Sequence, residues 1–447
     1  MRDWDCIIVG AGLAGLTCAF ELTERGWHPL VLEAEAVVGG RTSSWIQQGM
    51  PVESGLHRVL GFYHALPTVL KRAGIDLDAI VQWEDEFQIR VADGPHALFG
   101  AAPLHRPWQT LRGLAGNNDL IPPLEKLRLT RFFTAGLRAY FQRPLEFDEQ
   151  TVTSYARTYG VSERVIDTML TALTAGLFFL PPDRYSAYAF FGQLGPYLPR
   201  LLQFRVGGFL GGMTEVMCGP LAQAIQRRGA TVRTNAAVSR LRVRDDRVCG
   251  VELTSGEACA ARAVVLATPL DAAQRILNLD FAAHPDLQSL FSLPSMPAIT
   301  VQYELDRPIT RHDRTIFGPG SAVATLSEQS RTTFRHVPGR VSTILASPDQ
   351  FLACSDEELS RLTQRESRRL EIDLTDVRGY RVIRHPADFY SFEPGTERKR
   401  PEQRTSIPSL TLAGDYTRQP YLQTMEGAVV SGQRAAAVLL KAHTSPV

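Results

Sequence analysis

Two kinds of apolar pattern alternate along the first 33 residues. Residues 5–9 (DCIIV) and 29–33 (PLVLE) are short apolar runs rich in β-branched side chains, which is typical of buried strands. Between them, residues 16–25 carry apolar side chains at helical spacing and stop at Gly26. Residues 10–15 (GAGLAG) fill the gap before this helix. The pattern predicts a strand, a glycine turn, a helix and a second strand that ends in an acid.

The glycine turn has the spacing of a dinucleotide-binding motif. Gly10 allows the tight turn, Gly12 lets the backbone approach a pyrophosphate, and Gly15 lets the helix pack closely on the strand. The free N–H groups at the helix N-terminus attract phosphate. Glu33 ends the second strand, where a carboxylate can accept hydrogen bonds from ribose hydroxyls. The first 33 residues therefore predict nucleotide binding.

The central part of the chain has longer helical and strand patterns. Residues 81–99 read as a β-hairpin, residues 124–143 as a basic amphipathic helix, and residues 295–305 and 377–385 as strands. The amphipathic helix fits either an ordinary domain helix with a solvated face or a membrane interface. An aromatic-rich region (Phe178, Phe179, Tyr188, Phe190 and Phe191) fits either a core or an apolar substrate tunnel.

Residues 207–269 return to the alternation seen at the N-terminus. Glycines at 207–208 and 211–212 are expected to form a loop before a helix over residues 214–228. Strands are predicted over residues 231–234, 238–243 and 263–267. Residues 410–415 (LTLAGD) form a last buried strand, and a final helix is predicted to begin at Met425. Gly414 allows close approach, and Asp415 can accept hydrogen bonds from ligand hydroxyls.

Composition narrows the class of protein. The net charge of +1 gives no indication of nucleic-acid binding. The six cysteines form no C-x-x-C pair, which favours reduced thiols over a zinc site and predicts that no metal is bound. The N-terminus begins directly with a strand, so no signal peptide is expected. No apolar run has the length of a membrane span. The expected location is cytoplasmic, with contact to a membrane only at its surface.

Three motifs together resemble one family. Gly39-Gly40-Arg41 after the acid, the segment ESGLH followed by GFY at residues 53–63, and AGDYTRQPYLQTMEGA at residues 413–428 closely resemble the plant-type phytoene and ζ-carotene desaturases. These enzymes lie within the flavin amine oxidase superfamily. The resemblance implies an α/β fold in which a Rossmann-like FAD-binding domain, of the two-dinucleotide-binding-domain type, carries an interposed mixed α+β substrate domain. Residues 1–65, 205–285 and 405–447 would form the first domain, and residues 66–204 and 286–404 the second.

The resemblance also implies the activity. The expected reaction is FAD-dependent desaturation of an apolar isoprenoid or carotenoid-like substrate, with hydride transfer to flavin N5 and quinone or oxygen as electron acceptor. A flavin amine oxidase is the main alternative, but no lysine lies between Lys126 and Lys399 to serve its chemistry. No cysteine follows Cys354, which favours non-covalent FAD. A redox-neutral isomerase that uses reduced FAD and a prenyl-binding escort protein without flavin are the remaining alternatives.

The candidate site residues fall into three groups. His57, Tyr63 and Glu426 are candidate catalytic residues, and Phe178, Phe179, Tyr421 and Gln423 are candidate substrate contacts. The candidate cofactor-binding residues are Gly10, Gly12, Ala14, Gly15, Glu33, Ala34, Gly40, Arg41, His57, Arg58, Val238, Gly414, Asp415 and Met425.

Overall fold

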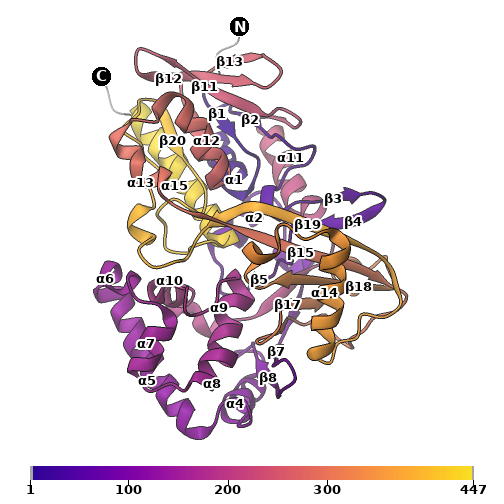
Figure 1. The fold of residues 1–447 in the computed structure, drawn as a ribbon. Coiled ribbons are helices and arrows are strands. Elements are labelled where there is room, and N and C mark those ends of the chain that lie inside the picture. The colour runs from indigo at the N-terminus through magenta and orange to yellow at the C-terminus, as the bar shows by residue number, and fades with distance from the viewer. Residues whose placement is uncertain (1–3, 445–447) are drawn as a thin grey trace.

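A five-stranded parallel sheet gathers segments from both ends and the middle of the chain (Figure 1). The computed structural model describes residues 4–444. The strands, in spatial order, are β10 (Thr231–Arg233), β2 (Leu30–Leu32), β1 (Ile7–Val9), β14 (Val264–Leu266) and β20 (Leu410–Leu412). All strands but β10 are buried throughout, as expected for a parallel sheet covered on both faces. Their carboxyl ends meet at one edge, where parallel α/β sheets bind ligands.

Helices from the two chain ends pack together beside this sheet. Helix α1 (Leu13–Thr23) follows β1, and α15 (Met425–Thr444) follows β20. Gly432 permits their close approach, because a Cβ there would lie 2.3 Å from the carbonyl oxygen of Ala14. Helices α11 (Gly219–Arg227) and α12 (Leu270–Phe281) complete the helical cover, and β11 (Val238–Arg244), β12 (Arg247–Leu253) and β13 (Ala258–Ala260) form an antiparallel sheet above it.

A seven-stranded mixed sheet forms a second centre of the fold, at the right of Figure 1. Its strands, in spatial order, are β19 (Val377–Tyr390), β15 (Ser295–Leu305), β18 (Gly339–Leu345), β17 (Val323–Glu328), β16 (Ile316–Phe317), β7 (Glu86–Arg90) and β8 (His96–Gly100). Only β16 and β7 pair in parallel. Helix α14 (Asp356–Arg369) packs on this sheet and starts with a capping box made by Ser355 and Glu358. Strand β19 also contacts α12, so it reaches back toward the parallel sheet.

A group of helices fills the lower left of Figure 1. Phe132, Phe147, Tyr155 and Phe191 pack their rings against one another at the centre of this group. Its helices and helical turns are α4 (Pro107–Ala115), α5 (Pro123–Gln142), α6 (Pro144–Asp148), α7 (Val152–Thr158), α8 (Glu163–Val165), η2 (Ile166–Leu170), α9 (Thr171–Phe178), α10 (Ala187–Gly192) and η3 (Gly195–Gln203).

Shorter elements join these regions. They are η1 (Gly40–Thr42), β3 (Ser44–Gln47), β4 (Met50–Glu53), β5 (Val59–Leu60), α2 (Ala65–Arg72), α3 (Leu77–Ile80), β6 (Val81–Glu84), β9 (Val206–Phe209), η4 (Thr214–Cys218), η5 (Pro285–Leu287), α13 (Gln288–Phe291), η6 (Pro348–Phe351) and η7 (Glu397–Lys399).

One prediction about these elements is wrong. Gly207 and Gly208 do not form a loop but lie inside β9, which pairs with β5 and β6. A Cβ at Gly207 would approach Val81 within 2.4 Å, so the glycine is required by close packing rather than by a turn. The predicted amphipathic helix is observed as α5, and its apolar side is only partly covered: Phe132 is buried, whereas Leu127 and Phe141 are more than half exposed.

The observed architecture confirms the predicted α/β class, with a parallel nucleotide-binding sheet and a separate mixed sheet. The residue boundaries of the two domains stay a prediction. Within residues 4–444, no helix is both long and apolar enough to cross a bilayer.

Candidate active site

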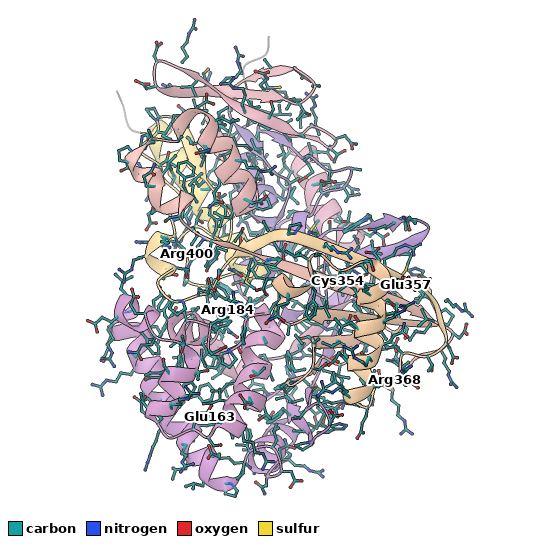
Figure 2. All side chains as sticks on the ribbon, in the orientation of Figure 1. Glu163, Arg184, Cys354, Glu357, Arg368 and Arg400 are labelled. Carbon is teal, nitrogen blue, oxygen red and sulfur yellow. The ribbon has the colours of Figure 1, made fainter. Side chains whose placement is uncertain are left out.

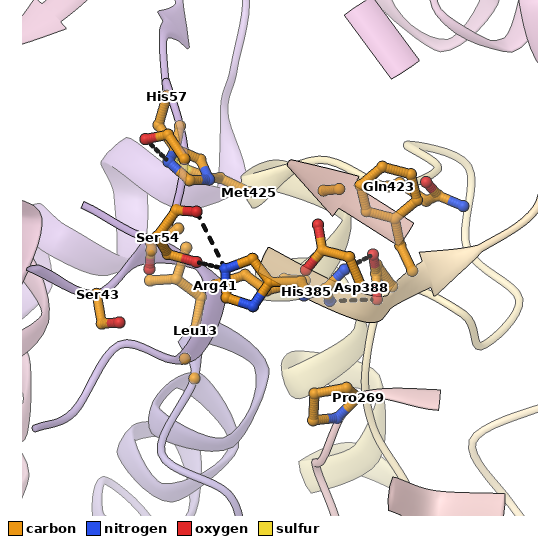
Figure 3. Close-up of a pocket in the computed structure, with 18 of the residues that line it drawn as sticks. Leu13, Arg41, Ser43, Ser54, His57, Pro269, His385, Asp388, Gln423 and Met425 are labelled. Atoms are coloured by element: carbon orange, nitrogen blue, oxygen red, sulfur yellow. Dashed lines mark hydrogen bonds and ion pairs between the residues drawn. The ribbon is translucent and has the colours of Figure 1, made fainter. Parts of the chain in front are cut away.

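One large cavity connects the carboxyl edge of the parallel sheet with the mixed sheet and the helical group. Its volume is about 2080 Å³. One part is lined by the glycine turn and by the segment that follows β20, and Figure 3 shows several of its polar residues. The other part is apolar, and its lining residues include Leu173, Leu177, Phe178, Phe190, Leu194 and Tyr197. The cavity is therefore polar at the nucleotide-binding edge and apolar farther away.

The glycine turn fits a dinucleotide phosphate. Gly10 has a φ of 105°, and a Cβ there would lie 2.7 Å from the carbonyl oxygen of Ala267. Gly12 is different: its φ of −73° suits any residue, and a Cβ there would meet no protein atom closer than 3.9 Å. Gly12 also precedes α1 without any side-chain cap, so the helix N-terminus is open toward the cavity. A glycine that the protein itself does not require is explained by a ligand that approaches its Cα.

Glu33 binds the glycine turn as well as facing the cavity. One carboxylate oxygen accepts from the N–H of Ala11 at 2.7 Å, and the other accepts from the N–H of Glu35 at 3.1 Å. Burial raises the pKa of Glu33, and these backbone hydrogen bonds oppose the shift. The remaining acceptor positions of the carboxylate are free for ribose hydroxyls, so the arrangement fits the predicted role.

Arg41 and Asp415 form an ion pair that joins the first and last motifs. The guanidinium donates to both carboxylate oxygens, at 2.9 Å and 2.7 Å, and Asp415 is 5% exposed (Figure 3). Burial alone would lower the pKa of Arg41, but the charge and hydrogen bonds of Asp415 outweigh it and raise that pKa. The sequence predicts both residues as cofactor contacts but gives no sign of their pairing. The bidentate pair fixes the guanidinium plane at the cavity wall.

His57 and Arg58 extend from the segment between β4 and β5 into the cavity wall. His57 Nδ1 lies 3.0 Å from the carbonyl oxygen of Gly55, and burial lowers the pKa of His57 to about 4. Arg58 donates to the carbonyl of Asp313 at 2.9 Å and to the hydroxyls of Thr315 and Ser327. His57 is therefore neutral near pH 7, and Arg58 holds this wall against the mixed sheet.

Glu426 is not placed as a catalytic residue. It is 1% exposed, does not line the cavity, and accepts from the N–H groups of His64, Ala65 and Leu66 at 2.7–2.9 Å. Its carboxylate thus caps α2 and attaches it to α15, so the candidate base is a helix cap.

Gly15 does not line the cavity either, which agrees with its predicted packing role, since a Cβ there would lie 2.0 Å from the Gly10 carbonyl oxygen.

The other predicted residues lie at the cavity. Burial raises the pKa of the Tyr63 hydroxyl well above its ordinary value, so Tyr63 is a hydrogen-bond donor rather than a base. Gln423 donates to the carbonyl of Tyr390, while its Oε1 is buried without a protein partner. The aromatic region divides: Phe178, Phe179 and Phe190 line the cavity, whereas Phe191 is core. The remaining predicted residues at the cavity are Ala14, Ala34, Gly40, Val238, Gly414, Tyr421 and Met425.

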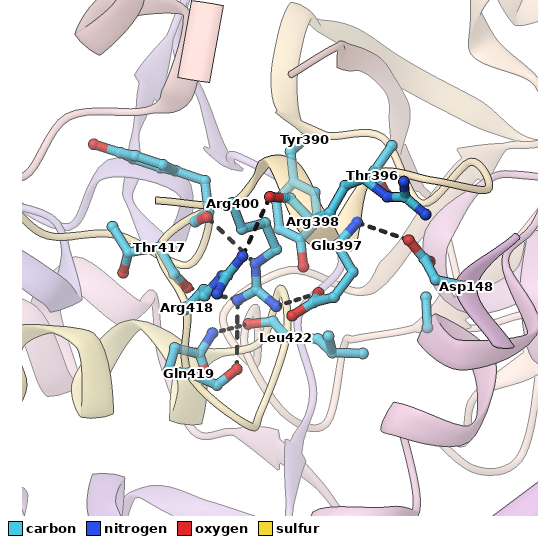
Figure 4. A network of polar contacts seen from close by, with 12 residues as sticks. Asp148, Tyr390, Thr396, Glu397, Arg398, Arg400, Thr417, Arg418, Gln419 and Leu422 are labelled. Atoms are coloured by element: carbon cyan, nitrogen blue, oxygen red, sulfur yellow. Dashed lines mark hydrogen bonds and ion pairs between the residues drawn. The ribbon is translucent and has the colours of Figure 1, made fainter. Parts of the chain in front are cut away.

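A buried arginine shapes the segment that carries Asp415 (Figure 4). The Arg400 guanidinium donates to the carbonyl oxygens of Asp415, Tyr416 and Thr417 at 2.6–3.3 Å, and it pairs with Glu397 at 2.8 Å. It also lies 5.0 Å from the centre of the Tyr390 ring. Arg400 therefore fixes the backbone that places Asp415 at the cavity.

Several polar cavity residues were missed by the sequence-based prediction. Ser54, Thr300, His385 and Asp388 line the cavity, and His385 contacts Ser54 (Figure 3). The sequence contains no recognisable motif around residues 385–388. These side chains reach the cavity only through the pairing of β19 with β15, which the local sequence pattern does not indicate. Among residues 4–444, no group of three or more potential metal ligands comes together, and the six cysteines are unpaired.

The fold and the cavity are those of a dinucleotide-binding protein. The family model described as flavin containing amine oxidoreductase matches residues 13–440, so the chain belongs to that family. The 15-cis-phytoene desaturase of Synechococcus elongatus is 28% identical, covering 97% of this chain and 95% of that protein. The 15-cis-phytoene desaturase of Solanum lycopersicum is 29% identical, covering 98% of this chain and 78% of that protein.

Solved structures show the same fold. Putrescine oxidase bound to putrescine superimposes with a TM-score of 0.74 at 19% identity, covering 98% of this chain and 99% of that one. The predicted resemblance to carotenoid desaturases and the predicted enzyme class are both confirmed. The protein is a flavin-dependent oxidoreductase homologous to carotenoid desaturases.

Proposed function

We propose that the protein binds FAD non-covalently and desaturates an apolar, isoprenoid-type substrate. The observation that carries the proposal is the continuity of the cavity, which runs from the glycine turn and Arg41–Asp415 to a wall of leucine and aromatic side chains. The bound flavin would supply hydride-accepting chemistry. A large apolar region beside it suits a long hydrocarbon chain better than a small polar substrate.

Different residues around the cavity would bind different parts of the cofactor and the substrate. Gly12 and the N-terminus of α1 would hold the pyrophosphate, Glu33 the ribose, and Val238 the adenine side. Arg41 and Asp415 would hold the polar part of the cofactor next to the pyrophosphate. Phe178, Phe179 and Tyr421 would orient the apolar chain and keep water from the reacting carbons. His57 and Tyr63, both neutral near pH 7, would contribute hydrogen bonds without a buried net charge.

The cavity disfavours oxidation of amines. None of the lysines within residues 4–444 (Lys71, Lys126, Lys399 and Lys441) lines the cavity. The apolar part of its wall would also desolvate an ammonium group without compensation. The same apolar wall fits a redox-neutral isomerase, so substrate reduction of the flavin distinguishes the two activities.

The surface near the cavity suggests how such a substrate arrives. Trp108, Leu111 and Leu114 of α4 are 54–81% exposed. Two leucines at the start of α5, Leu124 and Leu127, are 51–58% exposed beside them. We name these five residues the α4 patch. Together with the exposed Arg106 and Arg112, they favour peripheral contact with an anionic membrane surface. His105, which precedes α4, lies 3.5 Å from Arg205, which follows η3, and Leu201 of η3 lines the cavity.

Anaerobic flavin bleaching tests the proposal. The purified protein should be yellow and release FAD on denaturation. Polyene isoprenoids such as phytoene, presented in vesicles, should reduce the flavin, whereas putrescine and cyclohexylamine should leave it oxidised. Bleaching by amines alone would favour amine oxidation, and isomerisation without net flavin reduction would favour the isomerase. A colourless protein that does not bind added FAD would refute flavin-dependent catalysis altogether.

A further inference from the structure

His385 lines the cavity, and its hydrogen bonds fix which of its two ring nitrogens carries the hydrogen. Its Nε2 lies 3.1 Å from the carbonyl oxygen of Ser54 and 3.0 Å from the Ser54 hydroxyl (Figure 3). A carbonyl oxygen only accepts hydrogen bonds, so Nε2 must be the donor. In the neutral imidazole, Nδ1 then carries a lone pair. No residue within 4–444 hydrogen-bonds Nδ1, and the side chain lines the cavity.

His57 shows the same arrangement with the two nitrogens exchanged. Its Nδ1 donates to the Gly55 carbonyl at 3.0 Å, which leaves Nε2 as the acceptor. The two histidines are close enough for their charges to interact, and Arg41 acts on His57 as well. Burial lowers the pKa of His57 to about 4, so a proton on His57 is costly. The lone pair on His57 is therefore a poor proton acceptor.

His385 has a carboxylate nearby that His57 lacks. Asp388 lies three positions further along β19, lines the cavity and interacts with both His385 and Arg41. No side chain or backbone group within the described residues hydrogen-bonds its carboxylate. Burial raises the pKa of Asp388, while the positive charges of Arg41 and a protonated His385 favour its ionised form. Asp271 and Asp415 also act on Asp388, and Arg275, which pairs with Asp271, and Arg384 line the same cavity. When Asp388 is ionised, a proton gained by His385 would interact with its negative charge.

We propose that His385 is the proton acceptor of the dehydrogenation, with Asp388 stabilising the imidazolium that forms. In this step, one C–H bond gives its hydrogen and both bonding electrons as hydride to the flavin. The neighbouring carbon gives a proton to His385 Nδ1, and its electron pair forms the new C=C bond. Two hydrogens leave the substrate, and the flavin is the oxidant. The inference rests on the proposed function and names a residue that no sequence motif indicated.

Two substitutions separate the basic nitrogen from its hydrogen-bonding role. In His385→Gln, the amide nitrogen occupies the place of Nε2–H and can still donate to the Ser54 carbonyl, but no basic nitrogen remains. The second variant, His57→Asn, keeps the donor to Gly55, removes the other lone pair and tests His57 as the competing proton acceptor. Both variants should retain bound flavin with an unchanged absorption spectrum.

Transient kinetics measure the effect. With an isoprenoid that bleaches the native flavin, His385→Gln should slow anaerobic reduction about 100-fold or more, in the range typical of a lost general base. The native reduction rate should rise with pH along one ionisation that is absent in His385→Gln. His57→Asn should slow reduction less than His385→Gln, and a greater loss in His57→Asn would make His57 the proton acceptor and overturn the inference. His336→Gln, at an exposed histidine that does not line the cavity, is the control and should keep the native rate. Imidazole should partly restore His385→Ala. A His385→Gln rate within threefold of the native rate would overturn the inference.

The tautomer provides a readout independent of turnover. Long-range ¹H–¹⁵N correlation of histidine-labelled flavoprotein, assigned with His385→Gln, should show hydrogen on Nε2 and none on Nδ1 above pH 8. Hydrogen on Nδ1 would overturn the inference even before substrate is tested. If no isoprenoid reduces the native flavin, the proposed function fails and this inference with it. Normal native reduction with an unaffected His385→Gln variant refutes the inference alone.

Discussion

At the scale of single residues, alanine substitutions at Gly12 and Gly15 distinguish a role in ligand binding from a role in folding. Gly12→Ala places a methyl group where no protein atom lies within 3.9 Å, so the apoprotein should keep its melting temperature. The methyl group would enter the space proposed for the pyrophosphate, and flavin affinity should fall at least tenfold. Gly15→Ala meets the Gly10 carbonyl oxygen at 2.0 Å and should cost about 1–3 kcal/mol of stability or more. Flavin titration and thermal unfolding measure both effects; normal flavin affinity in Gly12→Ala would contradict the proposed phosphate position.

Glu53 is a second residue with a testable effect, because its buried carboxyl should make the stability of the protein depend on pH. It is 2% exposed, accepts from Gln329 at 3.1 Å, and burial raises its pKa from 4.5 to about 7. A carboxyl whose pKa is raised by folding stabilises the protein fully below its unfolded pKa, and this contribution is lost as the pH rises through the folded pKa. Glu53→Gln cannot ionise, so its stability relative to the native protein should increase by about 3 kcal/mol between pH 4.5 and pH 8.

Urea unfolding at several pH values tests this difference. Glu357→Gln, on the exposed face of α14, serves as the control and should show no comparable pH-dependent gain. A native-minus-variant difference that stays flat from pH 4.5 to pH 8 would mean that Glu53 remains ionised in the fold, held by the nearby charges of Arg58 and Arg340.

At the scale of elements, one buried side chain organises the segment after β20. Arg400 is 2% exposed and donates to three consecutive carbonyl groups while pairing with Glu397. Arg400→Met should cost about 3–5 kcal/mol, because Glu397 and the carbonyl groups lose a buried partner. Arg400→Lys should also be destabilising, since one ammonium group cannot reproduce the planar fork. Chemical denaturation measures both.

Arg184 provides a control for the loss of an arginine. It pairs with Asp349 and Glu393 at the surface and is 43% exposed, in the region labelled in Figure 2. Arg184→Ala should change the stability by less than about 1 kcal/mol. Equal losses in Arg184→Ala and Arg400→Met would show that burial of the Arg400 network contributes nothing specific.

Elements with strong local patterns could be predicted from the sequence, and contacts between distant elements could not. The strand, turn and helix around Gly10 follow from local spacing, and β15 was predicted with its observed bounds. The glycines of β9 were misread because close strand packing and a loop both require glycine. The Arg41–Asp415 pair and the placement of His385 beside Ser54 depend on strand pairing across the fold, which one sequence does not encode locally.

At the scale of the whole molecule, the α4 patch is the surface proposed to contact the membrane. Lys126 attaches the start of α5 to the end of α4 by donating to the carbonyl groups of Ala115 and Gly116 at 2.6 Å and 2.5 Å. This contact keeps the exposed side chains of both helices together. Three apolar side chains of α4 and two of α5 would bury their surface in a lipid interface, and the neighbouring arginines would lie among the headgroups.

Replacing Trp108 and Leu111 with serine should weaken binding to anionic vesicles at least tenfold, because membrane affinity follows the buried apolar area. The flavin spectrum and thermal stability should not change, since both side chains are more than half exposed. Val243→Ser, on β11 at the opposite end of Figure 1, removes an exposed apolar side chain far from the α4 patch and should bind vesicles normally. Vesicle co-sedimentation gives the affinities.

Flavin bleaching tests whether the α4 patch delivers substrate to the cavity. If it does, the double variant should reduce its flavin slowly with vesicle-borne isoprenoid but at the normal rate with the same isoprenoid in detergent. Equal slowing in both media would place the defect in the cavity instead of at the membrane.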